Sequence, residues 1–185
     1  SHHLAAAKAL EVIVGAGTGH GLSAVGEKMR RLMHYGQFFQ SHVLHFFHLS
    51  SPDFLFGIDG DPALRNIIGV AMNNRDLAVQ GVMMRKYGQE IIKHTAGKKI
   101  HGTCAIPGVI NKNLSIEERD ELLSVPDPMN SDKMVDWSVA ALDFFKDYHK
   151  NNQPLVDTFA AYPSNHLSLV REDGAFDIYH GVLRA

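Results

Sequence analysis

The stretch that most constrains the fold is GQFFQSHVLHFFHLSSPD at residues 36–53. Within it, His42, His45 and His48 recur every third residue. At about 100° per residue, these histidines and His34 share one helical stripe that is roughly 120° wide. Apolar side chains occupy the other directions, and a helix that is apolar all round is normally buried. We therefore expect a central helix whose histidines face a polar partner inside the domain.

Three interpretations of this histidine stripe are open. The histidines can be core residues that are bonded to neighbouring carbonyl and carboxylate groups. They can ligate a metal directly, in a freestanding histidine-rich helical bundle built on His34, His42 and His45. Against direct ligation, the sequence has no His-Glu-x-x-His pattern and no carboxylate between Glu27 and Asp53. The stripe can also tune a cofactor whose ligands lie outside this chain.

Length, charge and cysteine content exclude several classes of protein. The 185 residues suffice for one hydrophobic core, and we expect residues 1–185 to form a single domain. With a net charge of −2, the chain lacks the excess positive charge that is typical of proteins that bind nucleic acid or an anionic membrane. The single cysteine, Cys104, excludes an internal disulfide framework and any Cys-x-x-Cys metal site within the chain. No apolar run reaches the roughly 20 residues of a membrane span, so we expect a cytoplasmic protein without a membrane span.

The remaining patterns predict a mainly α-helical fold. Ser23 is the expected N-cap of the central helix, which should run from about Ala24 to Leu49 and be ended by Pro52 and the glycine- and aspartate-rich GIDGDP at residues 57–62. Further helices are expected over residues 3–14, 76–96, 115–124 and 131–150, and in a short helix after Asp61 and Pro62. A small β hairpin is expected near the C-terminus, where the sequence alternates around Asp173-Gly174.

Four stretches of the chain resemble the large subunit of nickel–iron hydrogenases, specifically the cytoplasmic NAD-reducing (bidirectional) type. They are SHHLAAAKALEVIVGAG, GEKMRRLMHYGQFFQSHVLHFFHLSSPD, GKKIHGTCAIPGVINKNLS and YPSNHLSLVREDGAFDIYHGVLRA. The second and third are the most specific, because the spacing of their histidines, their flanking residues and their order all agree with the family. The resemblance implies that the chain is an internal fragment of a longer large subunit, with the helical core that these subunits share.

The same resemblance implies a set of cofactors and partners. In the family, four cysteines hold a nickel–iron centre that carries carbonyl and cyanide ligands. One cysteine pair would precede Ser1 and the other would follow Ala185, so the fragment alone should be inactive and hold no cofactor. The parent would act as a hydrogen dehydrogenase, which oxidises H2 reversibly. Its electrons would pass through an iron–sulfur small subunit to NAD on diaphorase subunits. Without these partners, the fragment is expected to self-associate.

Three histidines match positions close to the cofactors of the family. His2 matches a histidine that would hydrogen-bond the metal-bound thiolates. His42 matches one on the central helix that approaches the active-site cavity, although Ser41 stands where many relatives carry aspartate. His101 matches a histidine between the metal site and the nearest iron–sulfur cluster, at the small-subunit interface, where it would tune the cluster potential by hydrogen bonding or stabilise that interface. The alternative for each is a purely structural histidine.

One rival interpretation comes from a different class of protein. A nickel-free electron-transfer scaffold related to respiratory complex I shares this helical architecture. The presence of cysteine pairs on both sides of the chain would distinguish a hydrogenase large subunit from such a scaffold.

Overall fold

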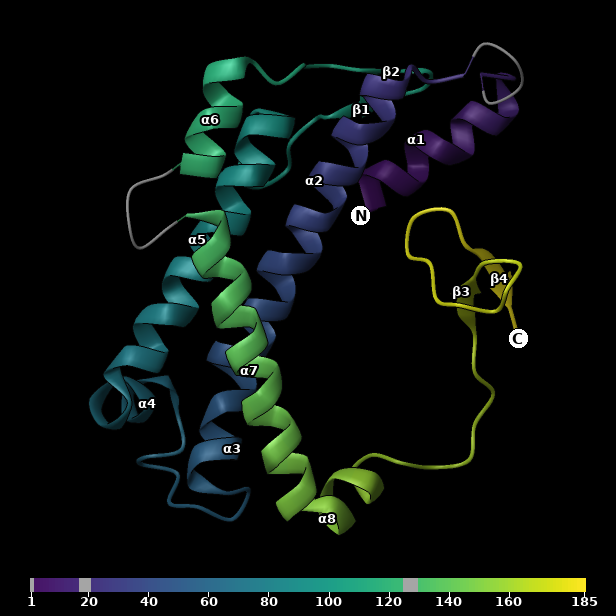
Figure 1. Cartoon of the computed structure of the whole chain (residues 1–185). Helices are drawn as coiled ribbons and strands as arrows, with labels where there is room; N and C mark the ends of the chain where they lie inside the picture. Colours follow the sequence, from purple (N-terminus) through teal and green to yellow (C-terminus); the bar gives the residue numbers. More distant parts are fainter. Residues whose placement is uncertain (1, 17–20, 125–129) are drawn as a thin grey trace. The chain divides into compact units, whose positions relative to one another are not determined.

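The computed structural model describes residues 2–16, 21–124 and 130–185, most of which are helical (Figure 1). The helices are α1 (His2–Ile13), α2 (Ala24–Val43), the π-helix η1 (Leu44–Ser50), α3 (Ser51–Phe56), α4 (Ile67–Asn73), α5 (Arg75–Ala96), α6 (Ile116–Ser124), α7 (Ser131–Asn151) and α8 (Gln153–Thr158). The short strands β1 (Ala105–Ile106) and β2 (Val109–Ile110) pair with each other, and so do β3 (Ser168–Val170) and β4 (Val182–Arg184). The predicted fold class, mainly α with a small hairpin near the C-terminus, is confirmed.

Contacts within the chain divide it into two compact units, residues 1–139 and 140–185. The first unit holds α1 to α6, the β1–β2 hairpin and the beginning of α7, and the second holds the rest of α7, α8 and the β3–β4 pair. A single domain over residues 1–185 stays a prediction. Among the described helices, none combines the length and the apolar character that a membrane crossing requires.

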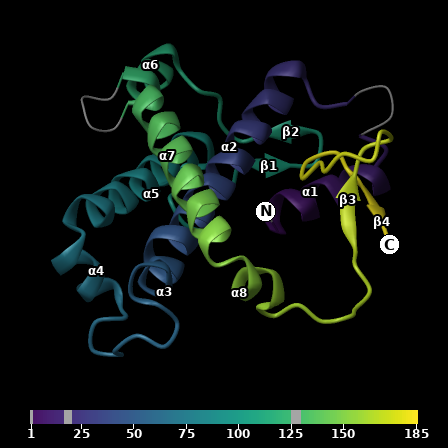
Figure 2. The ribbon, with the colours of Figure 1, turned by 60° about the horizontal axis from the view of Figure 1, so that its bottom comes forward.

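The antiparallel packing of α2 against α5 organises the first unit, as two views of the ribbon show (Figures 1 and 2). Glycines make this packing close. A Cβ atom on Gly88 would come within 2.6 Å of the Cβ of Gln40, and one on Gly36 within 2.6 Å of the Cγ2 of Ile91. Because these glycines carry no side chain, the two backbones approach where a larger residue would force them apart. The buried apolar residues of the two helices and η1 include Met29, Met33, Val43, Phe47, Met84 and Ile92.

The central helix is longer than predicted and changes character along its length. Ser23 caps its start, and the Ser23 Oγ accepts a hydrogen bond from the Gly26 N–H at 3.1 Å. Pro52 does not end the helix, because the preceding turns widen into η1. There the Ser51 N–H reaches back five residues to the Phe46 carbonyl. Pro52, which has no N–H to donate, then occupies the first turn of α3, where none is needed.

The structure corrects the expectation that all the stripe histidines face the core. His34 is buried and His48 is half-buried, but His42 and His45 are exposed. The elements that pack against α2, chiefly α5 and β2, cover one side of it and leave the other side open. The buried residues of this helix instead follow a stripe that begins at Gly26 and Met29 and continues to Phe47.

The prediction of a short helix that starts at Asp61 and Pro62 is wrong. Residues 61–66 form turns, in which the Asp61 Oδ1 accepts a hydrogen bond from the Ala63 N–H at 2.9 Å. The helix α4 begins at Ile67, because Asn66 supplies the cap. The Asn66 Oδ1 accepts from the backbone N–H groups of Ile68 and Gly69, at 3.0 and 3.1 Å.

The strand pairing near the C-terminus extends beyond the hairpin that the sequence indicates. Asp173 and Gly174 do form a turn, with Gly174 at φ +82°. After this turn, however, only an isolated bridge forms, between Val170 and Phe176. The regular antiparallel partner of β3 is β4, further along the chain, with Leu169 opposite Leu183. The predicted turn is present, and the antiparallel bridge across it agrees with the predicted hairpin, although the regular strand pairing lies further along the chain.

Candidate functional site

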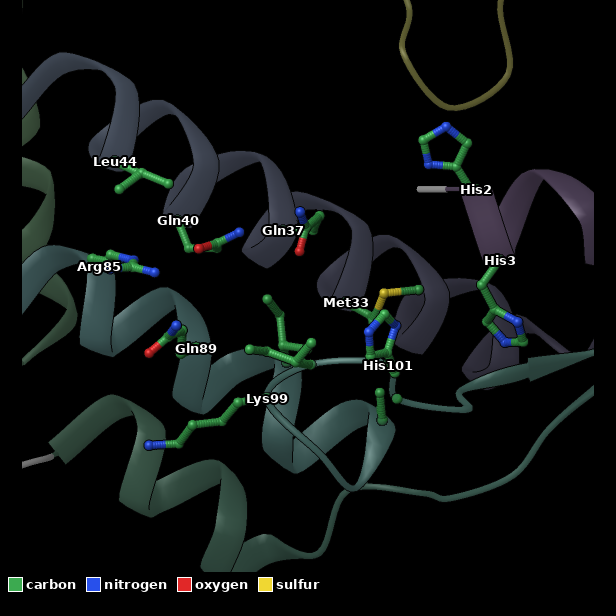
Figure 3. Close-up of a pocket in the computed structure, with 14 residues that line it drawn as sticks. His2, His3, Met33, Gln37, Gln40, Leu44, Arg85, Gln89, Lys99 and His101 are labelled. Atoms are coloured by element: carbon green, nitrogen blue, oxygen red, sulfur yellow. The ribbon is translucent and has the colours of Figure 1, made fainter. Parts of the chain in front are cut away.

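A cavity of about 450 Å³ lies in the first unit, between the start of α1, α2, α5 and the loop that follows α5 (Figure 3). The residues that line it on the two long helices have the same spacing along the sequence. On α2 and the first residue of η1 the lining residues are Met33, Gln37, Gln40 and Leu44, and on α5 they are Arg85, Gln89, Ile92 and Ala96. Both sets follow the i, i+4, i+7, i+11 pattern of one helical face, so two helical faces meet across the cavity.

Of the three histidines singled out from the sequence, His2 and His101 line this cavity and His42 does not. Figure 3 shows His2, His3 and His101 at one end of it. His42 stays against its own helix, where its Nδ1 lies 2.8 Å from the Phe38 carbonyl oxygen and its ring stacks on the Phe38 ring. The structure therefore brings together two of the three predicted residues, which are far apart in the sequence.

His101 has a strained backbone. Its φ of +54° lies in the left-handed region, where a residue with a side chain is uncommon and costs about 1 kcal/mol or more. Hydrogen bonds of Thr103, which lies between His101 and β1, hold this conformation. The Thr103 N–H donates to the Ala96 carbonyl at 3.2 Å, and the Asn111 side chain donates to the Thr103 carbonyl at 2.7 Å. The loop thus presents the exposed His101 side chain from a fixed backbone.

His3 also lines the cavity, although no feature of the sequence had singled it out. Its Nε2 accepts a hydrogen bond from the Ala105 N–H at 3.1 Å, which ties α1 to β1. Because Nε2 is the acceptor, the neutral ring carries its proton on Nδ1. No local pattern could have indicated this bond, because its two ends are far apart in the sequence.

A buried ion pair fixes the β1–β2 hairpin beside the cavity. Arg30 is only 1% exposed, and its Nη2 lies 2.6 Å from Glu11 Oε1. The same Nη2 donates to the Ile106 and Val109 carbonyl groups at 2.8 Å. Glu11 Oε1 in turn accepts from the Gly108 N–H at 2.8 Å. The hydrogen bond from Arg30 lowers the pKa of Glu11, so this pair is charged at neutral pH.

The turn of this hairpin carries its own signal in the sequence. Pro107 precedes Gly108, which has φ +80°, and the flanking residues pair as Ala105 with Ile110 and Ile106 with Val109. Proline followed by a glycine with positive φ is typical of a type II turn. The hairpin was therefore predictable, whereas its anchoring by Arg30 was not.

The side chains of the chain do not form a thiolate metal site. Cys104 has no exposed surface, and burial raises the pKa of its thiol, which disfavours the thiolate that a metal would need. In the described part of the chain, no three histidine, cysteine, aspartate or glutamate side chains gather where they could hold a metal ion. The histidine bundle built on His34, His42 and His45 is thus not assembled in these residues.

Burial and a neighbouring cation both act on the charge of His48. Burial lowers the pKa of His48, and the positive charge of Arg85 lowers it further. Its Nδ1 is buried without a hydrogen-bond partner among the described residues. His48 is therefore neutral at pH 7.

Known proteins resemble the chain in sequence, although no protein-family model matches it. The chain is 46% identical over 187 residues to the NAD-reducing hydrogenase HoxS subunit beta of Cupriavidus necator, a match that covers 100% of this chain and 38% of that protein. It is 38% identical over 184 residues to a vhu subunit of the F420-non-reducing hydrogenase of Methanocaldococcus jannaschii, covering 100% of this chain and 42% of that protein.

A similar solved structure also comes from a hydrogenase. The chain superposes with a TM-score of 0.88 and 48% identity on a crystal structure of an NAD+-reducing [NiFe]-hydrogenase in the H2-reduced state, and the match covers 100% of this chain and 39% of that chain. The chain thus spans about two fifths of the length of the relatives that it matches. By sequence and by fold, it is a homologue of hydrogenase subunits over its whole length.

Proposed function

We propose that this chain is the helical segment of the large, catalytic subunit of a cytoplasmic NAD-reducing nickel–iron hydrogenase. The observation that carries the proposal is the match to an NAD-reducing hydrogenase over the whole chain, at 46% identity in sequence and at a TM-score of 0.88 in fold. Identity to the F420-non-reducing hydrogenase subunits is lower, at 38% or less. This difference favours NAD as the electron acceptor of the parent complex.

The residues of this chain do not fit the nickel–iron centre as ligands. The centre expected from the resemblance needs several thiolates, and the sequence has the single cysteine Cys104, which is buried as a thiol. We therefore place the ligands, together with the carbonyl and cyanide groups, outside these 185 residues. On this proposal the chain alone neither holds the centre nor turns over H2, and it contributes the helical framework.

Within this framework, we propose that His2 and His101 act at the end of the cavity that they share. His2 stands at the first residue of α1, and His101 is presented by a loop whose backbone is fixed. Because His101 is exposed beside this cavity, it is placed to contact a partner, which we propose to be the iron–sulfur small subunit. For His42, which is exposed and bonds to its own helix, we propose an approach to the cofactor on a side of α2 away from this cavity.

Substitution of His101 in the intact complex tests this placement. His101→Ala should impair electron transfer to NAD, or association of the small subunit, by about tenfold while nickel content is retained. Nickel analysis and size-exclusion chromatography of the tagged complex would separate these effects. His42→Ala serves as the comparison and should have a smaller effect. Loss of nickel in His101→Ala would show that the histidine supports the metal site instead.

The gene that encodes the parent protein tests the assignment to a large subunit. On our proposal, a Cys-x-x-Cys pair is encoded directly before Ser1 and another beyond Ala185. A parent without either pair would instead be a nickel-free electron-transfer scaffold related to respiratory complex I. Metal analysis of the purified parent distinguishes the two directly, because only the hydrogenase should contain stoichiometric nickel.

A further inference from the structure

One end of the cavity carries polar side chains that have no hydrogen-bond or ion-pair partner in the described part of the chain. Figure 3 shows Arg85, Gln40 and Gln89 grouped there, away from the three histidines. The helices bring them together, because Gly88 of α5 lies against Gln40 of α2 and the two helices run antiparallel. Arg85, Gln40 and Gln89 are each half-buried. None of their side chains makes a hydrogen bond or ion pair with another residue in the part of the chain that the structure describes.

Arg85 has no counter-ion among the residues that the structure describes. Its Nε is buried without a hydrogen-bond partner among the described residues. Lys99, the other cation that lines the cavity, is already paired with Glu90 at 2.5 Å. No aspartate or glutamate is among the described residues that line the cavity. A guanidinium that is partly removed from water without a counter-ion is unfavourable, so this end of the cavity favours the binding of one negative charge.

The donors favour a carboxylate over other anions. A guanidinium presents a planar pair of N–H groups that matches the two oxygens of a carboxylate. The carboxamides of Gln40 and Gln89 can each donate a further N–H to the same oxygens. A carboxylate carries one charge, which matches the one unpaired cation, whereas a phosphate dianion would bring one charge too many. Leu44 and Ile92 line the cavity beside these groups and suit a short aliphatic stem.

We propose that this end of the cavity is a carboxylate-binding site, in which Arg85 forms the ion pair and Gln40 and Gln89 donate hydrogen bonds. The carboxylate belongs either to a small aliphatic acid or to an acidic side chain of another polypeptide segment. Both sources present the same group to Arg85. The site is independent of the electron acceptor of the parent, and its test does not require a metal centre.

Titration of the 185-residue chain tests the site and separates the two sources. The probes are butyrate and a neutral-capped pentapeptide of alanines with one central glutamate, each at millimolar concentration. The readout is the NMR signal of the Arg85 Nε–H group, which is buried and therefore protected from exchange. Saturable shifts with butyrate support a free small acid. Shifts with the peptide alone support a polypeptide carboxylate.

A second readout follows from His48, whose pKa burial and the charge of Arg85 both hold low. A carboxylate bound to Arg85 would offset that positive charge, so it should raise the pKa of His48. The NMR titration of the His48 ring in the presence and absence of butyrate or peptide measures this shift. It needs no substitution, so it tests the site even if variants of Arg85 fold poorly.

Substitutions identify the groups that bind. Arg85→Met should weaken binding by about ten- to a hundredfold, as expected for loss of a charge-assisted pair. Gln89→Leu should weaken it by about fivefold, since it removes one neutral donor. Arg75→Met, which changes an exposed arginine on the same helix outside this cavity, should bind as the unaltered chain does. Arg85→Lys keeps the charge without the planar fork and should bind at intermediate strength.

Three results would overturn the carboxylate site. One is the absence of any shift of the Arg85 Nε–H signal with both probes. Another is equal binding of chloride or sulfate, which would indicate a general anion site. The third is full binding in Arg85→Met, provided that its far-UV spectrum shows a folded chain.

Discussion

Single residues determine how firmly the β1–β2 hairpin is held beside the cavity. Arg30 is buried, and among the described residues Glu11 is the carboxylate that pairs with it. Removal of one member of a buried ion pair leaves an uncompensated charge, whereas a surface pair contributes little. The neighbouring Arg31 offers the comparison, since it forms a partly exposed pair with Glu27 at 3.0 Å on the same helix.

Glu11→Gln should therefore lower the free energy of unfolding of the 185-residue chain by about 3 kcal/mol. Glu27→Gln, the matched control at the exposed pair, should lower it by about 0.5 kcal/mol. Urea unfolding of the two variants, followed by circular dichroism, measures both values. Equal costs would mean that the buried pair is no more important than the surface pair.

Glu118 makes the stability of the folded chain depend on pH in the acidic range. Its hydrogen bond to Lys112, with distances of 2.6 and 2.7 Å to the two carboxylate oxygens, and the Ser115 N–H lower its pKa from 4.5 to about 2. The folded chain therefore binds this proton less readily than the unfolded chain. Its stabilising contribution is fully present above pH 4.5 and is lost as the pH falls from 4.5 toward 2.

We predict that Glu118→Gln flattens the loss of stability between pH 4.5 and pH 2. Lys112→Met removes the largest cause of the shift and should flatten the same part of the curve. Unfolding midpoints in urea across this range measure the effect. Identical pH profiles for the three chains would contradict this assignment of the pKa to the contact with Lys112.

At the scale of helices, glycine sets the distance between α2 and α5. A Cβ on Gly88 would lie 2.6 Å from the Gln40 Cβ and 3.0 Å from its backbone nitrogen, so the helices would have to separate. Gly88→Ala should then destabilise the chain by about 1–3 kcal/mol, despite the better helix propensity of alanine. A thermal or urea melt measures this cost.

Gly26→Ala is the matched control for this packing. The added Cβ would meet the Leu22 side chain at 2.7 Å, and that side chain can turn away. Its unfolding free energy should stay within about 0.5 kcal/mol of that of the unaltered chain. If Gly88→Ala were as harmless, the two helices would not be in the close contact that forms one wall of the cavity.

Local signals in the sequence predicted the elements well, because each signal acts within a few residues. Ser115 and Glu118 form the capping box that starts α6, at 3.1 and 3.0 Å, and Gly97 ends α5 at φ +78°. The pairing of β3 was missed because Asp173-Gly174 indicates a turn but not which later residues pair. Likewise, the end of the central helix was missed because η1 accommodates Pro52.

The candidate site was predicted only in part for the same physical reason. Resemblance singled out His2 and His101, which the fold then brings to one cavity. The contacts that build the cavity join residues that are distant in the sequence, such as Arg30 with Val109 and His3 with Ala105. No periodicity or spacing within one segment encodes such contacts. They depend on how the helices pack.

At the scale of the whole molecule, large apolar side chains remain exposed on α4 and α5. Met72 is 78% exposed and Ile68 is 68% exposed, and Val82 is 53% exposed. Large exposed apolar patches are typical of surfaces that contact other proteins. Self-association of the isolated chain, or its association with partner subunits, stays a prediction that sedimentation analysis would measure.

The central claim is that the parent of this chain is an NAD-reducing nickel–iron hydrogenase. The most direct measurement is the reduction of NAD+ under H2 by the complex purified through a tag on the parent protein. We predict that NADH forms with H2 and not under argon, and that the same preparation contains nickel. A nickel-containing preparation that forms no NADH under H2 would contradict the claim.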